Sequence, residues 1–261
     1  MARVSVEYRD HIAHVTLTRG DKMNALDEAM MQAIVAAGHE VAASGARAVV
    51  LSGEGKSFCA GLDLANFANQ GLEGDAGERL LARIHGDANL VQEVALVWRR
   101  VPVPVIAALH GAVYGGGVQL ALGADIRIAA PDAKLSVMEM KWGLVPDMGG
   151  MVLLPKLVRA DVLRQLIYTA RPIKAAQAEI WGLVTSLSDD PLAAALELAE
   201  EIANKSPSAI RAAKRLIDVA ETTGRADVLL AETAEQVQLI GKPDQMEVIA
   251  AQMQGRKPEF K

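Results

Sequence analysis

Three consecutive glycines, Gly115-Gly116-Gly117, stand directly before an apolar segment with helical character at residues 118–122. A run of glycines costs backbone entropy and adds no side-chain packing, so this position requires a bare backbone. A chain that enters a helix in this way exposes N–H groups at the positive end of the helix dipole, where an oxyanion or a phosphate can bind. A tight turn or a close helix contact would explain the same glycines. No Gly-Lys-Ser/Thr follows these three glycines, and their spacing is not Gly-x-Gly-x-x-Gly, so this stretch is neither of the two common nucleotide-binding loops.

Short strands and longer helices alternate around the glycines. Residues 4–8 and 12–18 alternate in hydrophobicity and predict a β-hairpin. An amphipathic helix is expected over residues 27–43, with Asp27 as its N-cap. Further strands are expected at 48–51, 105–109, 125–129 and 134–137, one long helix at 78–100, and a helical C-terminal part that contains residues 191–221 and 225–252. The repeated order strand, strand, helix predicts an α/β core, although strand–helix alternation would also fit a doubly wound fold.

The composition describes an ordered globular protein. The chain has 261 residues, of which 51% are apolar and only 3% aromatic, and this length supports one large domain with a smaller helical part. A net charge of −5 argues against nucleic acid or a membrane surface as partner. The single cysteine, Cys59, excludes an internal disulfide and fits a reducing compartment. The first residues lack an apolar signal region, so we expect a cytoplasmic protein.

Taken together, the motifs resemble the crotonase (enoyl-CoA hydratase/isomerase) superfamily over essentially the whole chain. The matching segments, in order, are TRGDKMNALD at 18–27, GEGKSFCAGLDL at 53–64, PVIAALHGAVYGGGVQLAL at 104–122, ADIRIA at 124–129, AKLSVMEMKWGLVPDMGG at 133–150, AAQAEIWGLV at 175–184 and GRKPEF at 255–260. Each piece alone is weak, but their order and spacing are specific.

The resemblance implies a crotonase-like spiral of repeated ββα units over residues 1–190. A C-terminal helical region, residues 191–261, would carry the trimer contacts, and the trimers of this family often pair into hexamers. The resemblance also implies an acyl-CoA thioester as substrate, with no metal and no other cofactor.

Family members hold the thioester carbonyl oxygen with two backbone N–H groups, which in this chain correspond to Leu62 and Gly116. Preorganised donors at this position stabilise a thioester enolate by a few kcal/mol. The CoA nucleotide is expected along residues of two matching motifs: Lys22, Ala25, Leu26, Ala60, Asp63 and Leu64. Lys22 also fits a solvated loop lysine, and Asp63 also fits a turn or cap residue.

Typical hydratases of this family place two glutamates at the enoyl group. The first position, three residues after the middle glycine, is Gln119 here, and the second is present as Glu139. An amide cannot transfer a proton at working pH, although it can hydrogen-bond a water or the substrate. Two-carboxylate hydration therefore lacks one of its acids, whereas double-bond isomerisation requires one base, which Glu139 can supply. A salt-bridged strand residue near Lys141 is the structural alternative for Glu139.

Asp147 follows Glu139 by eight residues in the VPDMGG turn. This spacing resembles dienoyl-CoA isomerases, where acids at both positions shuttle protons, although those enzymes typically carry an acid at the position of Gln119 as well. The nucleophilic aspartate of aromatic-acyl-CoA dehalogenases lies in the same region, but their aromatic pocket residues are not evident here. Asp147 also fits a cap for a helix that starts near Gly149.

The sequence therefore predicts an acyl-CoA enzyme in which Glu139 is the general acid/base, Asp147 a second proton carrier or substrate orienter, and Gln119 a polar positioner. Isomerisation fits these residues better than hydration, in which Gln119 would only orient the water that Glu139 activates. An acyl-CoA-binding protein without catalysis is the alternative from another class.

Overall fold

A large sheet forms the centre of the computed structural model, which describes residues 2–63 and 76–260. Its strands, in spatial order, are β1 (Val4–Arg9), β2 (Ile12–Leu17), β3 (Ala48–Gly53), β4 (Val105–Leu109), β6 (Ile126–Ala129) and β9 (Ser186–Leu187). The β1–β2 pair is the predicted antiparallel hairpin, and every later pair in this sheet is parallel.

A smaller sheet contains β5 (Ala112–Tyr114), β7 (Lys134–Ser136) and β8 (Ile173–Lys174). Successive units of the chain add one strand to each sheet, since β4 and β6 pair in the large sheet and β5 and β7 pair in the small one. An isolated parallel bridge between Cys59 and Val113 continues this arrangement into the preceding unit. The chain therefore forms stacked turns, which is the predicted spiral rather than a doubly wound fold.

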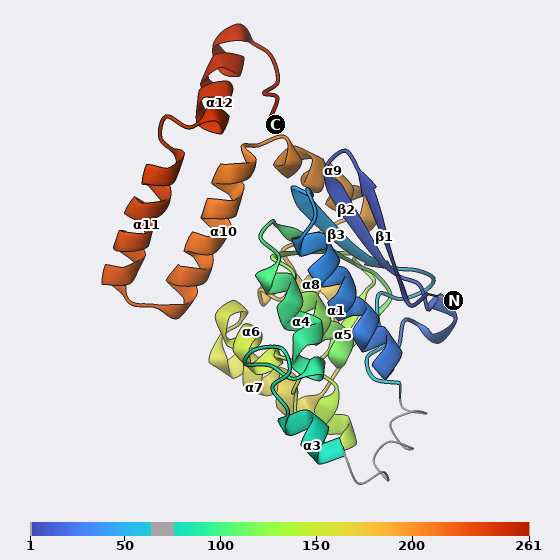
Figure 1. The fold of residues 1–261 in the computed structure, drawn as a ribbon. Helices are drawn as coiled ribbons and strands as arrows, with labels where there is room; N and C mark the ends of the chain where they lie inside the picture. The colour runs from blue at the N-terminus through green and yellow to red at the C-terminus, as the bar shows by residue number, and fades with distance from the viewer. Residues whose placement is uncertain (1, 64–75, 261) are drawn as a thin grey trace.

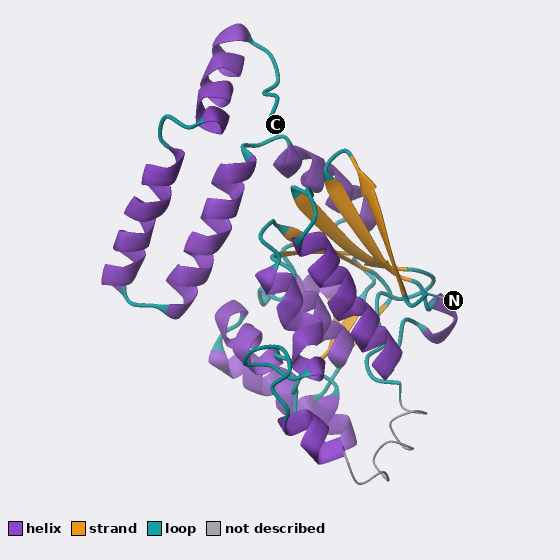
Figure 2. Ribbon diagram, in the orientation of Figure 1, coloured by secondary structure: helices purple, strands orange, loops and turns teal. Residues whose placement is uncertain are grey.

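Apolar side chains cover both faces of the large sheet, as expected for buried parallel strands. On one face, α1 (Glu28–Ala42) and α4 (Leu90–Arg100) pack against side chains such as Val49 and Leu51. On the other face, small residues of α9 (Pro191–Ala203) pack against Ala48 and Val50. Helices thus enclose the sheet from both sides (Figure 2). The remaining helices are α3 (Ala76–Leu81), α5 (Gly116–Leu122), α6 (Gly150–Leu157), α7 (Ala160–Thr169), α8 (Ala175–Ile180), α10 (Pro207–Thr222), α11 (Arg225–Leu239) and α12 (Pro243–Gln254).

The sequence predicts the start of α1 correctly but misses the break between α3 and α4. Asp27 is the N-cap of α1, and its side chain accepts a hydrogen bond of 2.8 Å from the Met30 N–H. The single helix predicted over residues 78–100 is wrong, because the chain leaves the helix after α3 and re-enters it at α4. Gly86 has a φ of +76° in this break, and Asn89 starts α4 with a capping box that includes Gln92.

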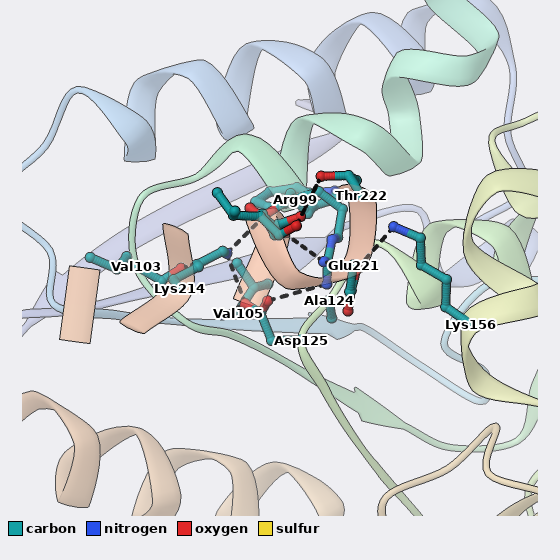
Figure 3. Close-up of polar contacts among 12 residues, drawn as sticks. Arg99, Val103, Val105, Ala124, Asp125, Lys156, Lys214, Glu221 and Thr222 are labelled. Atoms are coloured by element: carbon teal, nitrogen blue, oxygen red, sulfur yellow. Dashed lines mark hydrogen bonds and ion pairs between the residues drawn. The ribbon is translucent and has the colours of Figure 1, made fainter. Parts of the chain in front are cut away.

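Buried charges join α10 to the main body (Figure 3). The Lys214 ammonium donates hydrogen bonds to the Trp98 carbonyl at 3.3 Å, the Val103 carbonyl at 3.0 Å and the Asp125 carboxylate at 2.8 Å. Arg99 of α4 also forms an ion pair of 2.7 Å with Asp218, which lies on α10 like Lys214. Burial lowers the pKa of Lys214, and the charge of Asp125 opposes this shift. These contacts hold α10 across the end of α4 and the start of β6.

The last two helices, α11 and α12, extend away from the body as an arm (Figure 1). None of the residues of α11 is buried, and α12 buries only Ala251. Large apolar side chains of this arm are exposed, among them Leu230 at 71% and Met253 at 84%. Within residues 2–63 and 76–260, no helix is long and apolar enough to cross a bilayer.

Replacement of Lys214 tests the anchor of α10. In Lys214→Met the Asp125 carboxylate and two carbonyls lose a buried donor, so the free energy of unfolding is expected to fall by about 3 kcal/mol. Urea unfolding followed by circular dichroism measures the change. Lys156→Met is the matched control, because Lys156 pairs with Glu221 nearer the surface and its loss is expected to cost less than about 1 kcal/mol. Equal effects of the two substitutions would contradict the assignment.

Candidate active site

Three chain segments leave the small sheet at the same edge. Cys59, β5 and β7 run parallel to one another, so the residues that follow them emerge side by side. These following residues include Leu62, Gly116 and Glu139, three of the residues that the sequence predicts for the site. Carboxyl ends of parallel strands are the usual place for ligand sites in α/β sheets. The spiral thus gathers at one edge residues that are up to 77 positions apart.

Glycines allow these segments to approach closely. A Cβ atom on Gly117 would lie 2.2 Å from the Cys59 carbonyl oxygen, and one on Gly61 would lie 2.5 Å from the Tyr114 oxygen. Gly61 also has a φ of +86°, which favours glycine. The same Gly61 position is 3.4 Å from the Gly116 nitrogen, so the residue before Leu62 packs directly against Gly116. Close packing therefore explains Gly61 and Gly117, as one of the two interpretations predicted.

Gly116 is the first residue of α5, and Gly115 precedes it with a φ of +51°. N–H groups in the first turn of a helix have no partner within that helix. A Cβ atom on Gly116 would lie 2.6 Å from the Met148 sulfur and 2.9 Å from the Leu26 Cδ1 atom. The bare backbone is therefore bordered by apolar side chains, which exclude water and strengthen electrostatic interactions there.

Backbone hydrogen bonds hold Leu62 in position. The Leu26 N–H donates to the Gly61 carbonyl at 2.8 Å, and the Asp63 N–H donates to the Leu26 carbonyl at 3.0 Å. The Ala60 N–H donates to the Met23 carbonyl at 2.9 Å. The two motifs predicted to contact CoA thus lie against each other like a pair of short strands.

Arg19 and Asn24 organise the same two motifs, and the sequence analysis did not single them out. Arg19 forms ion pairs of 2.8 Å with Asp63 and 3.3 Å with Asp27. Asn24 is fully buried, accepts a hydrogen bond from the Arg19 N–H and donates to the carbonyls of Glu54 and Ser57. Asn24 has a φ of +54°, a conformation that asparagine tolerates, so the residue type is the only sequence signal that agrees with this turn.

The residues predicted to bind CoA differ in their accessibility. Lys22 is exposed, Ala25 and Ala60 are half-buried, and Leu26 is buried. Asp63 pairs with Arg19, which agrees with a structural role, while Leu64 lies outside the described residues. Their contacts with CoA remain predictions.

Gln119 has no solvent exposure and connects three segments of the site. Its amide oxygen accepts hydrogen bonds from the Met148 N–H at 2.8 Å and the Gly150 N–H at 2.9 Å. Its amide nitrogen donates to the Glu139 Oε1 atom at 2.5 Å. The oxygen thus caps the start of α6 with both of its lone pairs, and the nitrogen holds Glu139.

Glu139 begins the 3-10 helix η2 (Glu139–Trp142), so the alternative of a strand residue is wrong. Its side chain is 9% exposed, and the buried Oε2 atom has no hydrogen-bond partner among the described residues. Burial raises the pKa of Glu139, and the charge of Asp147 adds to the shift, while the hydrogen bond from Gln119 opposes it. A carboxylate held at one oxygen, unsatisfied at the other and raised in pKa has the properties of a general base.

Asp147 lies beside Glu139 and does not cap α6, since the N-cap residue of that helix is Gly149 and Gln119 accepts the helix N–H group. Asp147 itself is exposed to solvent. Desolvation by the neighbouring protein atoms nevertheless raises the pKa of the Asp147 carboxyl. The structure therefore brings Gln119, Glu139 and Asp147 together into one acidic cluster.

Cys59 is fully buried, and burial raises the pKa of its thiol to about 12. Its sulfur donates to the Asn24 carbonyl at 3.2 Å. A thiol with this pKa is not a nucleophile at neutral pH, so Cys59 is a packing residue.

Residues 7–261 match the sequence profile of the family described as Enoyl-CoA hydratase/isomerase. The chain belongs to this family. A solved enoyl-CoA hydratase of Bacillus anthracis is 30% identical, with a TM-score of 0.89 and 99% of each chain covered. The predicted crotonase superfamily and its α/β fold are thereby confirmed.

Two relatives of this family carry different activities in their names. Human mitochondrial Delta(3,5)-Delta(2,4)-dienoyl-CoA isomerase is 39% identical over 211 residues, which cover 78% of this chain and 64% of the human protein. The chain thus spans somewhat less than two thirds of that isomerase. The enoyl-CoA hydratase EchA19 of Mycobacterium tuberculosis is 33% identical over 258 residues, covering 98% of this chain and 95% of the relative.

The environment of Glu139 predicts an unusual pH dependence of stability. A carboxyl with a raised native pKa binds its proton more tightly in the folded state, so ionisation costs folding free energy as the pH rises from the usual carboxyl range through the native pKa. Glu139→Gln removes this cost. We expect the stability of the wild type relative to Glu139→Gln to fall as the pH rises above about 4, measured by urea unfolding at a series of pH values. A difference independent of pH would contradict the raised pKa.

Proposed function

We propose that this protein moves a carbon–carbon double bond in an enoyl-CoA thioester, with Glu139 as the single general base. The observation that carries this proposal is the asymmetry between the two residues at the family's acid positions. The amide oxygen of Gln119 accepts hydrogen bonds from two backbone N–H groups, whereas Glu139 has a buried oxygen without a hydrogen-bond partner among the described residues. One proton-transfer group at these two positions suits isomerisation, in which the same group can remove and return the proton.

The proposed reaction starts with the Glu139 carboxylate taking a proton from the carbon α or γ to the thioester carbonyl. The electron pair of that C–H bond moves into the conjugated system and places negative charge on the thioester oxygen. The N–H groups of Leu62 and Gly116 would hold this oxygen, and each such donor contributes roughly 3 kcal/mol to a transition state of this kind. Glu139 then returns the proton to the other end of the system, which leaves the double bond in its new position.

Gln119 would act as a positioning residue, because its amide fixes Glu139 Oε1 and leaves Oε2 for the substrate. Asp147 would carry a second proton or orient the acyl group, and the resemblance to dienoyl-CoA isomerases supports this role. The CoA part of the substrate would lie along the paired motifs that contain Lys22, Ala25, Leu26, Ala60 and Asp63, with Leu64 following them.

Hydration is the second candidate, and the similarity to EchA19 over almost the full length of both chains favours it. In this reaction Glu139 would activate a water, and the second amide hydrogen of Gln119 would help to hold it. The two candidates share the oxyanion donors and the base, and differ in whether water is added.

Mass spectrometry in deuterated water distinguishes the candidates. The protein is incubated with crotonyl-CoA, a 3-enoyl-CoA and a 3,5-dienoyl-CoA, and we expect deuterium incorporation with a moved double bond. Glu139→Gln is expected to slow this reaction by about 100- to 10,000-fold, whereas Glu7→Gln, on the edge strand β1, serves as the unaffected control. Faster addition of water than isomerisation would favour hydration. Binding of CoA esters without turnover of any substrate would favour a non-catalytic role.

Gln119→Glu adds a further arm to this experiment. Its new carboxylate would lie beside Glu139, where two oxygens at about this separation share one proton. Isomerisation is then expected to slow and hydration of crotonyl-CoA to rise, since both family acids are present. If the ratio of isomerised to hydrated product does not change, Gln119 does not select between the two reactions.

We also infer that α11 and α12 contact other copies of the chain, in the homotrimer or hexamer that the family resemblance implies. Their exposed apolar residues support this assembly, because such side chains favour burial in an interface. Light scattering is expected to give three or six times the 27.7 kDa of one chain. Leu230→Glu is expected to lower the assembly mass, and Gln236→Glu, which adds the same charge at a polar position of α11, is the control. A wild-type protein of monomer mass would overturn the inference.

A further inference from the structure

Two histidines and a glutamate meet on the helical layer, away from the acidic cluster of the candidate active site. They are His39 in the last turn of α1, His85 in the break between α3 and α4, and Glu93 in the first turn of α4. One side-chain nitrogen or oxygen from each lies within 4.8 Å of those of the other two. We propose that these three residues bind a divalent transition metal of the zinc type.

Close packing of two helices produces the first half of this site. A Cβ atom on Gly38 would lie 2.4 Å from the Val97 Cγ2 atom, so α1 and α4 approach each other more closely than side chains normally allow. The two helices lie side by side in the body (Figure 1). Because Glu93 is one turn before Val97, this approach brings its carboxylate to within 3.8 Å of the His39 Nε2 atom.

The break between α3 and α4 supplies the third ligand. His85 and Ala88 exchange backbone hydrogen bonds of 3.1 and 3.4 Å across a tight turn. Gly86, with a φ of +76°, makes this turn possible. The turn holds the ring of His85 with its centroid 6.2 Å from that of His39. A continuous helix through residues 78–100 would not place His85 there.

The partners of Glu93 leave one oxygen for a metal. Arg100 donates to the Oε2 atom, and it also pairs with Asp87 at 2.8 Å, which fixes its position. The Oε1 atom faces His39 at a distance that is too long for a hydrogen bond. Glu93 is only 1% exposed, so a cation at Oε1 would further stabilise the buried carboxylate that Arg100 already contacts at Oε2. A metal ligand whose second oxygen is held by a hydrogen-bond donor is the usual arrangement in protein metal sites.

Two imidazoles, one carboxylate and one water form a common tetrahedral zinc set. Ligand atoms around such an ion are separated by roughly 3.3 Å, given zinc–ligand distances near 2.0 to 2.1 Å. The ligand atoms are now up to 4.8 Å apart, and rotation of both imidazoles toward the buried Glu93 would bring them to this spacing. His39 has room for this rotation because its side chain is 60% exposed, and His85 is only half-buried. A bound ion would link α1, the turn and α4.

Direct metal binding tests the proposal. The full chain is stripped with a chelator, and Zn²⁺ binding is measured by competition with a chromophoric chelator. We expect one tight ion per chain, and at least about tenfold weaker binding in both His39→Ala and His85→Ala. His11→Asn is the control, since His11 lies outside the cluster and asparagine tolerates its φ of +65°. Equal binding by all four proteins, or none by the wild type, would overturn the site.

Two further readouts distinguish this site from ions held elsewhere. Co²⁺ in the wild type is expected to show the intense visible absorption of a four-coordinate ion, and the two alanine variants are expected to lose it. Zn²⁺ is also expected to raise the melting temperature of the wild type and of His11→Asn but not of His85→Ala, because the ion stabilises only the state it binds. A rise of equal size in His85→Ala would contradict the assignment.

Discussion

The absence of side chains at a few points allows the turns of the spiral to stack. The Cys59 carbonyl lies where a Cβ atom of Gly117 would be, and the Tyr114 carbonyl lies where one of Gly61 would be. A side chain at either position would push residues 59–61 away from β5 and from the start of α5. The separation of successive turns, and with it the distance between Leu62 and Gly116, therefore depends on bare backbone.

Gln119 turns this stacked framework into a site with a defined charge. A glutamate at this position could accept the same two backbone N–H groups, but its second oxygen would face Glu139 at close range, and the pair would hold a shared proton. The neutral amide instead donates to Glu139, so that only one carboxyl in the buried part of the site ionises. Asp147, which is partly open to solvent, supplies the second negative charge from the side. The proposed preference for isomerisation over hydration therefore rests on the hydrogen bonds of this one side chain.

Burial of Glu139 illustrates a cost that the fold sustains at this site. Folding would proceed more favourably with an amide or an apolar group there, since the carboxylate leaves water and gains only one hydrogen-bond donor from a side chain. The raised pKa is the measure of this cost, and the same shift makes the group a stronger base toward a carbon acid. Lys214 shows the opposite solution, in which three acceptors satisfy a buried charge and the result is an anchor for α10.

The amino-acid sequence by itself determined the features that depend on neighbours in the chain. Alternating apolar residues predicted the first hairpin, Asp27 was correctly identified as a cap, and three glycines indicated a bare backbone next to α5. The order of the motifs also identified the family and the positions of Gln119, Glu139 and Asp147. Each of these signals is a local preference of the backbone or a fixed spacing, so no distant contact is needed to recognise it.

Only the tertiary structure decided what those residues do to one another. The acceptors and donors of Gln119 come from segments 20 to 31 residues away, and Arg19 meets Asp63 across 44 residues. The residues of the break before α4 do carry a local signal, since Gly86 disfavours a helix and Asn89 favours an N-cap. The structure shows that both are used, in a turn closed by His85 and Ala88. Hydrogen bonds and charges join residues that are distant in the sequence, whereas hydrophobic periodicity reports only on neighbours in the chain. The chemistry of the active site depends on the distant contacts, so it is visible only in the folded structure.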